Sequence, residues 1–355
     1  MRASKKILIL GASYGSLLAS KLMLAGHTVH LVCLPAEAEL IDRDGIRVRF
    51  PVKGREGLVE LDSRTLPAYL SASGPADVAP GDFDLVALAM QEPQYRSAGV
   101  RELLGAVAAA KRPCMSIMNM PPLAYLARIP GVPLDACRAA YTDPSVWDGF
   151  DPALMTLCSP DPQAFRPPDE PVNVLQVRLP TNFKAARFVD DAHTALLRQL
   201  ESDIFAARLD LVGERIDLPV KLRIHDSVFV PLAKWSMLLA GNYRCIGADS
   251  MRAIREAVHT DLDATRAVYE WVAQLCKSLG AAEADLVPFE KYAAAAQALV
   301  GPSSAARALF GGAANIERVD RLVQIIAAQR NLQSDAVDEI VARVDARLAL
   351  NRSRA

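Results

Sequence analysis

The first 34 residues contain a strand, a helix and a second strand, and this order limits the fold more than any other feature. Lys5–Leu10 is a short apolar run of the kind found in buried strands of parallel sheets. From Gly15 to Ala25, leucines recur at helical spacing, and Gly26 is typical of a helix end. His27–Leu34 predicts the second strand. A β-α-β unit this early in the chain indicates a parallel sheet covered by helices.

The same alternation continues to about residue 212, and only helical patterns follow from Phe229. The ranges predicted as strands are 46–50, 83–90, 114–119 and 172–177, and those predicted as helices are 36–43, 93–110, 189–202, 229–241, 250–279, 288–299, 315–329 and 335–349. Prolines are dense between 141 and 171, where no element is assigned. We therefore predict an α/β chain: an N-terminal Rossmann-like domain at 1–212, with a doubly wound parallel sheet, and an all-helical C-terminal domain at 213–355.

Composition excludes several classes of protein. The 355 residues are 51% hydrophobic, and 40 basic side chains against 41 acidic ones give a net charge of −1. Such a chain has no overall field to attract nucleic acid or an anionic membrane. No run of about 18 apolar residues predicts a membrane span. The basic N-terminus resembles an export signal, but no small-residue cleavage site follows it, so we expect a cytoplasmic protein.

The cysteines and histidines give no metal-binding pattern. No two of the six cysteines have C-x-x-C spacing, and the five histidines form no H-E-x-x-H motif. We expect buried, reduced thiols and no metal.

The turn after the first strand is the first candidate site. It reads Gly11, Ala12, Ser13, Tyr14, Gly15 and Ser16, and it only approximates G-x-G-x-x-G, because either register keeps a single glycine. Its context is that of a dinucleotide site, because a strand precedes it and a helix with unpaired N–H groups follows. The alternative is a tight turn that binds nothing.

Three stretches of the chain resemble ketopantoate reductases (2-dehydropantoate 2-reductases). The opening resembles theirs through residues 6–16, 24–29 and 42–48. Asp226 and Asn242 each stand eight residues from Lys234, as around the catalytic lysine of that family. Ser303-Ser304 and the stretch 315–320 resemble its later Ser and Glu segment, with a spacing that differs by one residue. The middle of the chain, about 125–185, matches poorly.

The resemblance implies reduction of a 2-oxo acid by a nicotinamide, with NADP as the expected cofactor and NAD as the alternative. It assigns Lys234 as the proton donor, held by Glu317, with Asn119 and Asn242 as further catalytic residues and Ser304 and Asn242 at the substrate. Cofactor contacts are implied for the turn at 11–16 and for Leu34, Met90, Gln91 and Asn119. A lysine on an apolar helix can both donate a proton and stabilise an alkoxide. On a regular α-helix, Asn242 lies about 80° around the axis from Lys234.

Each of these residues also has a purely structural alternative. Lys234 could be an ordinary amphipathic lysine, Asn242 a helix cap, Asn119 a turn residue, and Ser304 an N-cap. We further expect a homodimer, because the stretch Val268–Leu279 is apolar enough to form an interface.

Departures from the family pattern leave other functions open. Leu238 replaces an asparagine, Leu34 a basic residue and Met90 a lysine, so the cofactor and substrate sites are less polar than in the family. Met120-Pro121-Pro122 follows Asn119 where the family has glycine, and proline fixes the backbone there. One alternative is an opine-type dehydrogenase with His225-Asp226 as its acid and base. Another is a non-catalytic nucleotide-binding protein.

Overall fold

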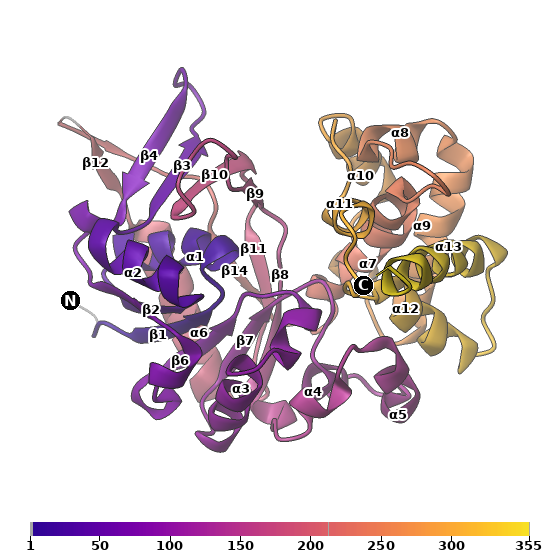
Figure 1. The fold of residues 1–355 in the computed structure, drawn as a ribbon, viewed down its shortest axis with the longest axis horizontal. Coiled ribbons are helices and arrows are strands. Elements are labelled where there is room, and N and C mark those ends of the chain that lie inside the picture. Colours follow the sequence, from indigo (N-terminus) through magenta and orange to yellow (C-terminus); the bar gives the residue numbers. More distant parts are fainter. Residues whose placement is uncertain (1–2, 212, 355) are drawn as a thin grey trace. The chain divides into compact units, whose positions relative to one another are not determined.

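The computed structural model describes residues 3–211 and 213–354, which form two compact units. The first unit consists of Met1–Met90, Gln94–Met118 and Val146–Asp226, and the second of Gln91–Pro93, Asn119–Ser145 and Ser227–Ala355. Figure 1 draws the chain from indigo at the N-terminus to yellow at the C-terminus. The chain thus enters the second unit three times.

The first unit is built on an eight-stranded sheet, which confirms the prediction of a mostly parallel sheet with helices. In sheet order, the strands are β14 (Leu222–His225), β11 (Phe183–Ala186), β8 (Met155–Ser159), β7 (Cys114–Ile117), β6 (Leu85–Leu88), β1 (Lys6–Leu10), β2 (Thr28–Val32) and β5 (Leu70–Ser73). Every neighbouring pair is parallel except β8 and β11. The helices of this unit are α1 (Ala12–Leu24), α2 (Pro35–Asp44), α3 (Val100–Ala109) and α6 (Asp191–Ala206).

The strand order reverses beside β1. The chain proceeds from β1 through β2 to β5 on one side, and from β6 through β7 to β8 on the other. In open α/β sheets, ligands bind at the carboxyl ends of the strands at such a switch point. Leu10 of β1 pairs with Val32 of β2 and Leu88 of β6, so the residues after these three positions share one edge of the sheet.

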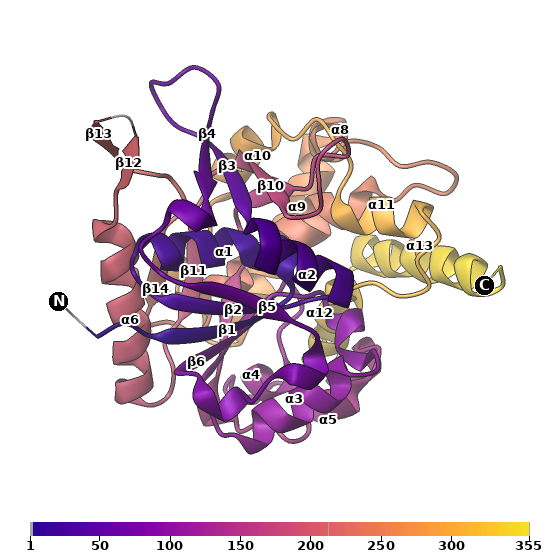
Figure 2. The same ribbon diagram turned by 60° about the vertical axis from the view of Figure 1, so that its left-hand side comes forward.

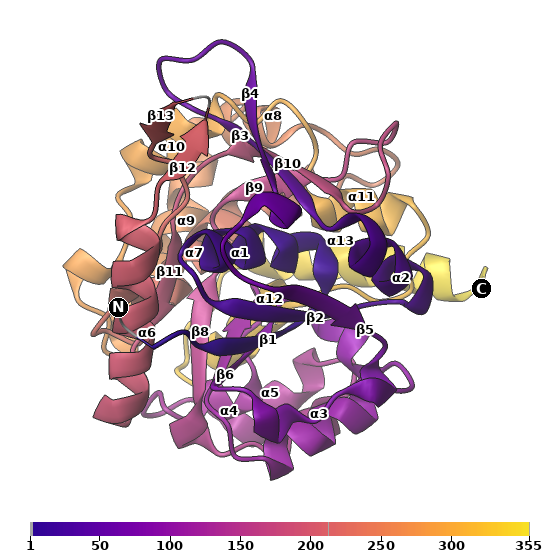
Figure 3. The ribbon, with the colours of Figure 1, turned by 90° about the vertical axis from the view of Figure 1, so that its left-hand side faces the viewer.

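Helix α1 is covered on both sides, which explains its sequence. A second sheet of β4 (Leu58–Asp62), β3 (Arg47–Pro51), β10 (Val174–Leu179) and β9 (Gln163–Phe165) contacts it opposite the large sheet. Figures 2 and 3 show α1 above the β1–β2 layer and α3 below it. Nearly every side chain of α1 from Gly15 onward is buried, so the helix is covered on all its faces and shows no single apolar face.

The second unit is helical. Its helices are α4 (Leu123–Leu126), α5 (Leu134–Cys137), α7 (Lys234–Met237), α8 (Ile254–His259), α9 (Leu262–Ser278), α10 (Phe289–Ala296), α11 (Ser304–Phe310), α12 (Val319–Ala328) and α13 (Asp335–Arg352). Helix α12 contacts both α5 and α13, which ties the segment 119–145 to the C-terminal helices. Within the described residues, no helix is long and apolar enough to cross a membrane.

Several predicted helices differ in detail. The range 250–279 is two helices, because Asp261 leaves helical geometry and caps α9 by accepting a hydrogen bond from the Ala264 N–H. In the range 93–110, the α-helix begins only at Val100, after Gly99 with a φ of 78°. The range 229–241 begins as a 3₁₀ turn at Val230–Ala233, continues as α7, and ends in a π-helical turn.

Other short elements went unpredicted. The proline-rich range 141–171 contains β8 and β9, and β11, β14 and a small hairpin of β12 (Leu209–Leu211) and β13 (Glu214–Ile216) follow. The remaining 3₁₀ turns are Ser63–Thr65, Pro75–Asp77, Pro80–Asp82, Glu92–Arg96, Arg138–Ala140, Pro144–Trp147, Pro152–Leu154, Tyr243–Cys245 and Glu283–Asp285.

The boundaries of the two units also differ from the single domain boundary that we predicted at residue 212. Residues 213–226 belong to the first unit because β14 pairs with β11 and extends the large sheet. Residues 119–145 belong to the second unit through α4 and α5.

Candidate active site

Gly11 forms the turn that joins β1 to α1 at the switch point. Its φ of 102° is one that side chains with a Cβ rarely adopt. A Cβ there would stand 2.6 Å from Met90 Cγ and 2.8 Å from the Ala89 carbonyl oxygen. The Gly11 N–H donates to the Val32 carbonyl oxygen over 2.8 Å, so this turn is fixed against both neighbouring strands.

Gly15 allows α1 to approach the sheet closely. A Cβ at this position would lie 2.7 Å from Ile9 Cγ2 of β1. Gly11 and Gly15 therefore have the two roles of a dinucleotide turn that depend on packing, namely the tight turn and the close contact between helix and strand. The first turn of α1 presents its N–H groups at the carboxyl edge of the sheet, where an anion is favoured.

The other residues of the turn are placed differently from one another. Ser13 is exposed at the N-terminus of α1, and Ala12 is buried. The Ser16 hydroxyl donates back to the Ala12 carbonyl oxygen. The Tyr14 hydroxyl donates to the Pro162 carbonyl oxygen over 2.7 Å, and its ring packs edge-on against Phe183. Tyr14 thus anchors α1 to the neighbouring strands, and Ser13 is the turn side chain most open to a ligand.

The carboxyl end of β2 carries a charged pair that the sequence did not reveal. Leu34 is 74% exposed there and occupies the position before the first residue of α2, with no side-chain cap. In the first turn of α2, Glu37 forms an ion pair with Arg166, which follows β9. Arg43 lies in the last turn of α2 and pairs with Asp44.

A small pocket in the second unit contains five of the residues assigned from the resemblance. Its volume is about 20 Å³, room for a water molecule. Its lining residues are Gln91, Asn119, Leu238, Asn242, Tyr243, Ser304, Ala305, Ala308, Ile316 and Glu317. Five of these, Gln91, Asn119, Asn242, Ser304 and Glu317, are predicted site residues that come from four separate stretches of the chain.

Asn119 and Glu317 form a buried polar pair in this pocket. The Asn119 Nδ2 donates to Glu317 Oε2 over 3.0 Å. Burial raises the pKa of the Glu317 carboxyl to about 7, against the Asn119 hydrogen bond and the backbone N–H groups of Glu92 and Met120, which lower it. The second oxygens of the pair, Asn119 Oδ1 and Glu317 Oε1, are buried and accept no hydrogen bond from the described residues. These two acceptor oxygens are therefore available to a ligand group that donates a hydrogen bond.

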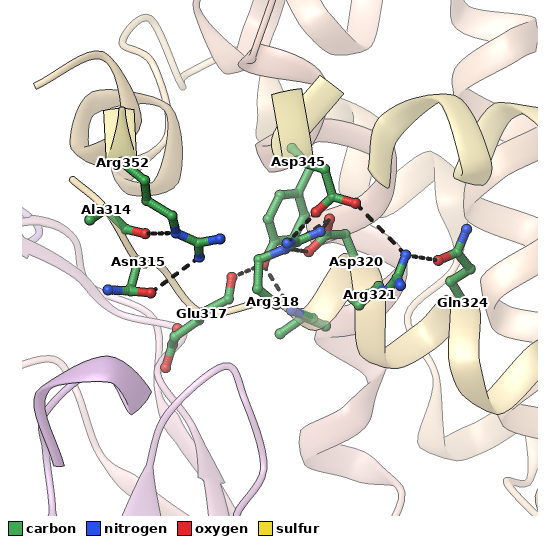
Figure 4. Close-up of polar contacts among 11 residues, drawn as sticks. Ala314, Asn315, Glu317, Arg318, Asp320, Arg321, Gln324, Asp345 and Arg352 are labelled. Atoms are coloured by element: carbon green, nitrogen blue, oxygen red, sulfur yellow. Dashed lines mark hydrogen bonds and ion pairs between the residues drawn. The ribbon is translucent and has the colours of Figure 1, made fainter. Parts of the chain in front are cut away.

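The backbone around Glu317 is held in place from two sides. The Tyr243 hydroxyl donates to the Glu317 carbonyl oxygen and accepts from the Val319 N–H over 3.0 Å. Arg318 forms ion pairs with Asp320, at 3.0 Å, and with Asp345, at 2.6 Å (Figure 4). These contacts fix the direction from which the Glu317 side chain enters the pocket.

A π-helical turn separates Lys234 from Asn242. The Tyr243 N–H donates to the Leu238 carbonyl oxygen five residues earlier. One such turn inserts an extra residue, so eight residues advance the helix by about seven α-helical steps and leave the two positions about 20° apart instead of about 80°. Lys234, which is half-buried, and Asn242 therefore stand on nearly the same side of the helix, although Lys234 itself does not line the pocket.

Tyr292 of α10 lies against this π-helical turn. Its hydroxyl donates to the Met237 carbonyl oxygen over 3.2 Å. A Cβ on Gly241 would stand 1.9 Å from the same hydroxyl oxygen. The turn thus depends on a glycine at 241, because a side chain inserted against a helix needs a residue without a Cβ.

Ser303 and Ser304 have different roles. Ser303 caps α11, since its hydroxyl accepts from the Ala306 N–H at 3.1 Å and donates to the Asn242 carbonyl oxygen at 2.7 Å. Ser304 is exposed and lines the pocket. The capping alternative considered for Ser304 thus belongs to its neighbour.

The alternative acid and base, His225 and Asp226, lies in the first unit. His225 ends β14, and the Asp226 carboxylate forms a 2.8 Å ion pair with Arg198 of α6. The Asp226 side chain is 78% exposed, so this carboxylate is paired at the surface instead of lying in a pocket. These positions give no support to an opine-type acid and base.

No protein-family model and no curated protein matches the chain. Among solved structures, it is similar to 2-dehydropantoate 2-reductase from Methylococcus capsulatus, with a TM-score of 0.65 and 14% identity over 99% of this chain and 98% of that one. It is similar to D-mandelate dehydrogenase solved with NADH and anilino(oxo)acetate, with a TM-score of 0.63 and 14% identity over 98% and 99%. A dimeric ketopantoate reductase from Staphylococcus aureus gives 0.60 and 12% over 98% and 99%. At these identities the similarity establishes the fold along nearly the whole chain.

Proposed function

We propose that this protein is an NAD(P)H-dependent reductase of a 2-oxo acid or a related carbonyl compound. The observation that carries the proposal is the pocket in the second unit, which gathers Gln91, Asn119, Asn242, Ser304 and Glu317. The sequence resemblance to ketopantoate reductases independently assigns each of these residues to the cofactor, the substrate or the chemical step. Residues that far apart in sequence seldom gather by chance around one buried polar pair.

The turn at Gly11 fits a dinucleotide. Gly11 and Gly15 leave the space that a Cβ would fill, and the N-terminus of α1 offers N–H groups to a pyrophosphate. A bound nicotinamide would supply the hydride for the reduction. The chain's own residues would then bind, orient and protonate the substrate.

In this proposal, Lys234 donates a proton from Nζ to the carbonyl oxygen, and its charge stabilises the alkoxide. Asn242, on nearly the same side of the helix, donates a hydrogen bond to the substrate. Through the oxygens that accept no hydrogen bond from the described residues, Glu317 and Asn119 hold a ligand group that donates one, such as a hydroxyl.

The substrate side chain is expected to be less polar than that of ketopantoate. Leu238, Ala305, Ala308 and Ile316 supply the apolar part of the pocket lining, and Leu238 stands where the family has an asparagine. D-mandelate dehydrogenase, whose structure with anilino(oxo)acetate has a similar fold, is itself named for an aromatic substrate. We therefore expect 2-oxo acids whose side chains carry no hydroxyl or other polar group to react faster than ketopantoate.

The charged pair beside Leu34, Arg166 and Glu37, can bind the ribose of the cofactor and its 2′ substituent. Arg166 can bind a 2′-phosphate, and Glu37 can accept hydrogen bonds from a ribose diol. Because the guanidinium forms a two-point contact with phosphate, we propose NADPH as the preferred cofactor.

The experiment is a spectrophotometric assay of NADPH oxidation across a panel of 2-oxo acids. Activity with at least one 2-oxo acid, lost in Lys234→Ala while NADPH still binds, supports the proposal. Tight cofactor binding without turnover of any 2-oxo acid would instead favour a nucleotide-binding protein, and absence of binding would contradict both.

We also propose that the protein is a homodimer, as the Staphylococcus aureus enzyme is. The interface expected at Val268–Leu279 needs correction, because Val268, Val272 and Leu275 are buried in the core of the second unit itself. Light scattering of the purified protein tests the proposed state.

A further inference from the structure

A second pocket in the helical unit is lined by three arginines. Its volume is about 440 Å³, within the usual range for small-molecule sites. The charged residues of its lining are Arg244, Arg252, Arg343 and Glu339. We call it the arginine pocket. Nothing in the proposed reaction uses it.

Arg244 and Arg252 form one wall of the arginine pocket. Arg244 follows the π-helical turn, and its guanidinium donates to the Thr265 hydroxyl. The Arg252 Nε donates to the Arg244 carbonyl oxygen over 3.0 Å. Both side chains are half-buried, and among the residues that the structure describes neither forms an ion pair with a carboxylate.

The third arginine comes from the C-terminal helix. Arg343 of α13 is exposed and pairs with Glu339, one turn earlier on the same helix. The lining therefore carries three positive charges and one negative charge, and the negative charge is already paired.

Positive charge gathered in a partly buried place is costly unless an anion accompanies it. Burial lowers the pKa of the Arg244 guanidinium, and the nearby charges of Arg252 and Arg343 lower it further, while Asp261 acts in the opposite direction. The repulsion among the three guanidinium groups is relieved when a ligand brings negative charge between them.

We propose that the arginine pocket binds a small molecule that carries two or more negative charges, namely a phosphate ester or a polycarboxylate. Guanidinium groups present planar pairs of N–H donors that match the oxygens of both groups. The arginine pocket is distinct from the candidate active site, although one helical segment adjoins both. Asn242 lines the candidate active site, and Arg244 lines the arginine pocket.

The test is isothermal titration of the full-length protein with inorganic pyrophosphate and with citrate, at a fixed low salt concentration. We expect saturable binding that Arg252→Gln weakens by about tenfold or more, since hydrogen bonds to charged groups contribute that much. The matched control is Arg255→Gln, which removes the same charge from an exposed site outside the pocket and should leave the affinity within about twofold. Tighter binding of pyrophosphate would indicate a phosphate site, and tighter binding of citrate would indicate a carboxylate site.

Pyrophosphate can also bind at the N-terminus of α1, so location must be shown separately. Crystals soaked in tungstate should give anomalous density beside Arg244, Arg252 and Arg343. Arg343→Gln, on an exposed side chain, replaces Arg252→Gln if the latter fails to fold. The proposal is wrong if neither anion binds saturably, or if the pocket variants bind as tightly as Arg255→Gln.

Discussion

Replacing Glu317 with glutamine should make the protein more stable at alkaline pH than the wild type. The carboxyl is buried and its pKa is raised to about 7 from an ordinary value of 4.5. Because the folded state holds this proton more tightly than the unfolded state does, stability falls as pH rises through the interval between the two values. Glutamine keeps an oxygen that can accept the hydrogen bond from Asn119, and it cannot ionise.

The magnitude follows from the two pKa values. At 1.36 kcal/mol per pH unit, the full cost of ionising Glu317 in the folded state is about 3 kcal/mol. About 2.5 kcal/mol of this cost should develop between pH 5 and pH 8, because the unfolded carboxyl is already mostly ionised at pH 5. The free energy of unfolding of the wild type should therefore fall by about 2.5 kcal/mol relative to that of Glu317→Gln from pH 5 to pH 8.

Guanidinium unfolding of both proteins at pH 5, 6, 7 and 8 measures this difference. Trp235 and Trp271 belong to the same unit as Glu317, so tryptophan fluorescence reports on its unfolding. Glu270→Gln on α9 is the control, because that side chain is exposed and its ion pair with Arg266 lies at the surface. A difference between wild type and Glu317→Gln that stays constant within about 0.5 kcal/mol from pH 5 to 8 would refute the reasoning.

Three further substitutions test other parts of the structure. Gly241→Ala should destabilise the protein by about 1–3 kcal/mol, because the new Cβ would displace the Tyr292 hydroxyl. Gly105→Ala in α3 is the control: a Cβ there meets no other atom, so this variant should be as stable as the wild type or more stable. Thermal unfolding compares the two variants. Lys21 is buried, and desolvation lowers its pKa to about 7. Between pH 7 and pH 9, the free energy of unfolding of the wild type should therefore rise by about 2 kcal/mol relative to that of Lys21→Met. Denaturant titrations in which this difference falls with pH would contradict the predicted sign. Arg166→Gln should weaken NADPH binding about tenfold and leave NADH binding nearly unchanged in fluorescence titrations, and equal losses for both cofactors would remove Arg166 from the 2′-phosphate site.

The core of the first unit could be predicted because its signals are local. Hydrophobic runs and the small residues at 11–16 lie within a single β-α-β unit, and the predicted strands at 5–10 and 27–34 correspond to β1 and β2. Strands β8 and β11 were missed for a physical reason. They lie among prolines or short loops and are defined by pairing with distant partners.

The candidate site was predictable only through the resemblance, because its parts come from four stretches. Periodicity alone cannot show that Asn119 and Glu317, 198 residues apart, form a hydrogen bond. The π-helical turn also leaves no periodic signal, and the Tyr292 hydroxyl that packs against its Gly241 comes from a separate helix. Arg166 was missed because its partner, Glu37, is 129 residues away.

The most direct test of the proposed function is the rate of NADPH oxidation by wild type and Lys234→Ala with the best 2-oxo acid of the panel. We predict that the variant binds NADPH as the wild type does and loses kcat by at least about 100-fold, as expected for removal of a general acid. Wild-type turnover that persists unchanged in Lys234→Ala would contradict the assignment of Lys234 as the proton donor.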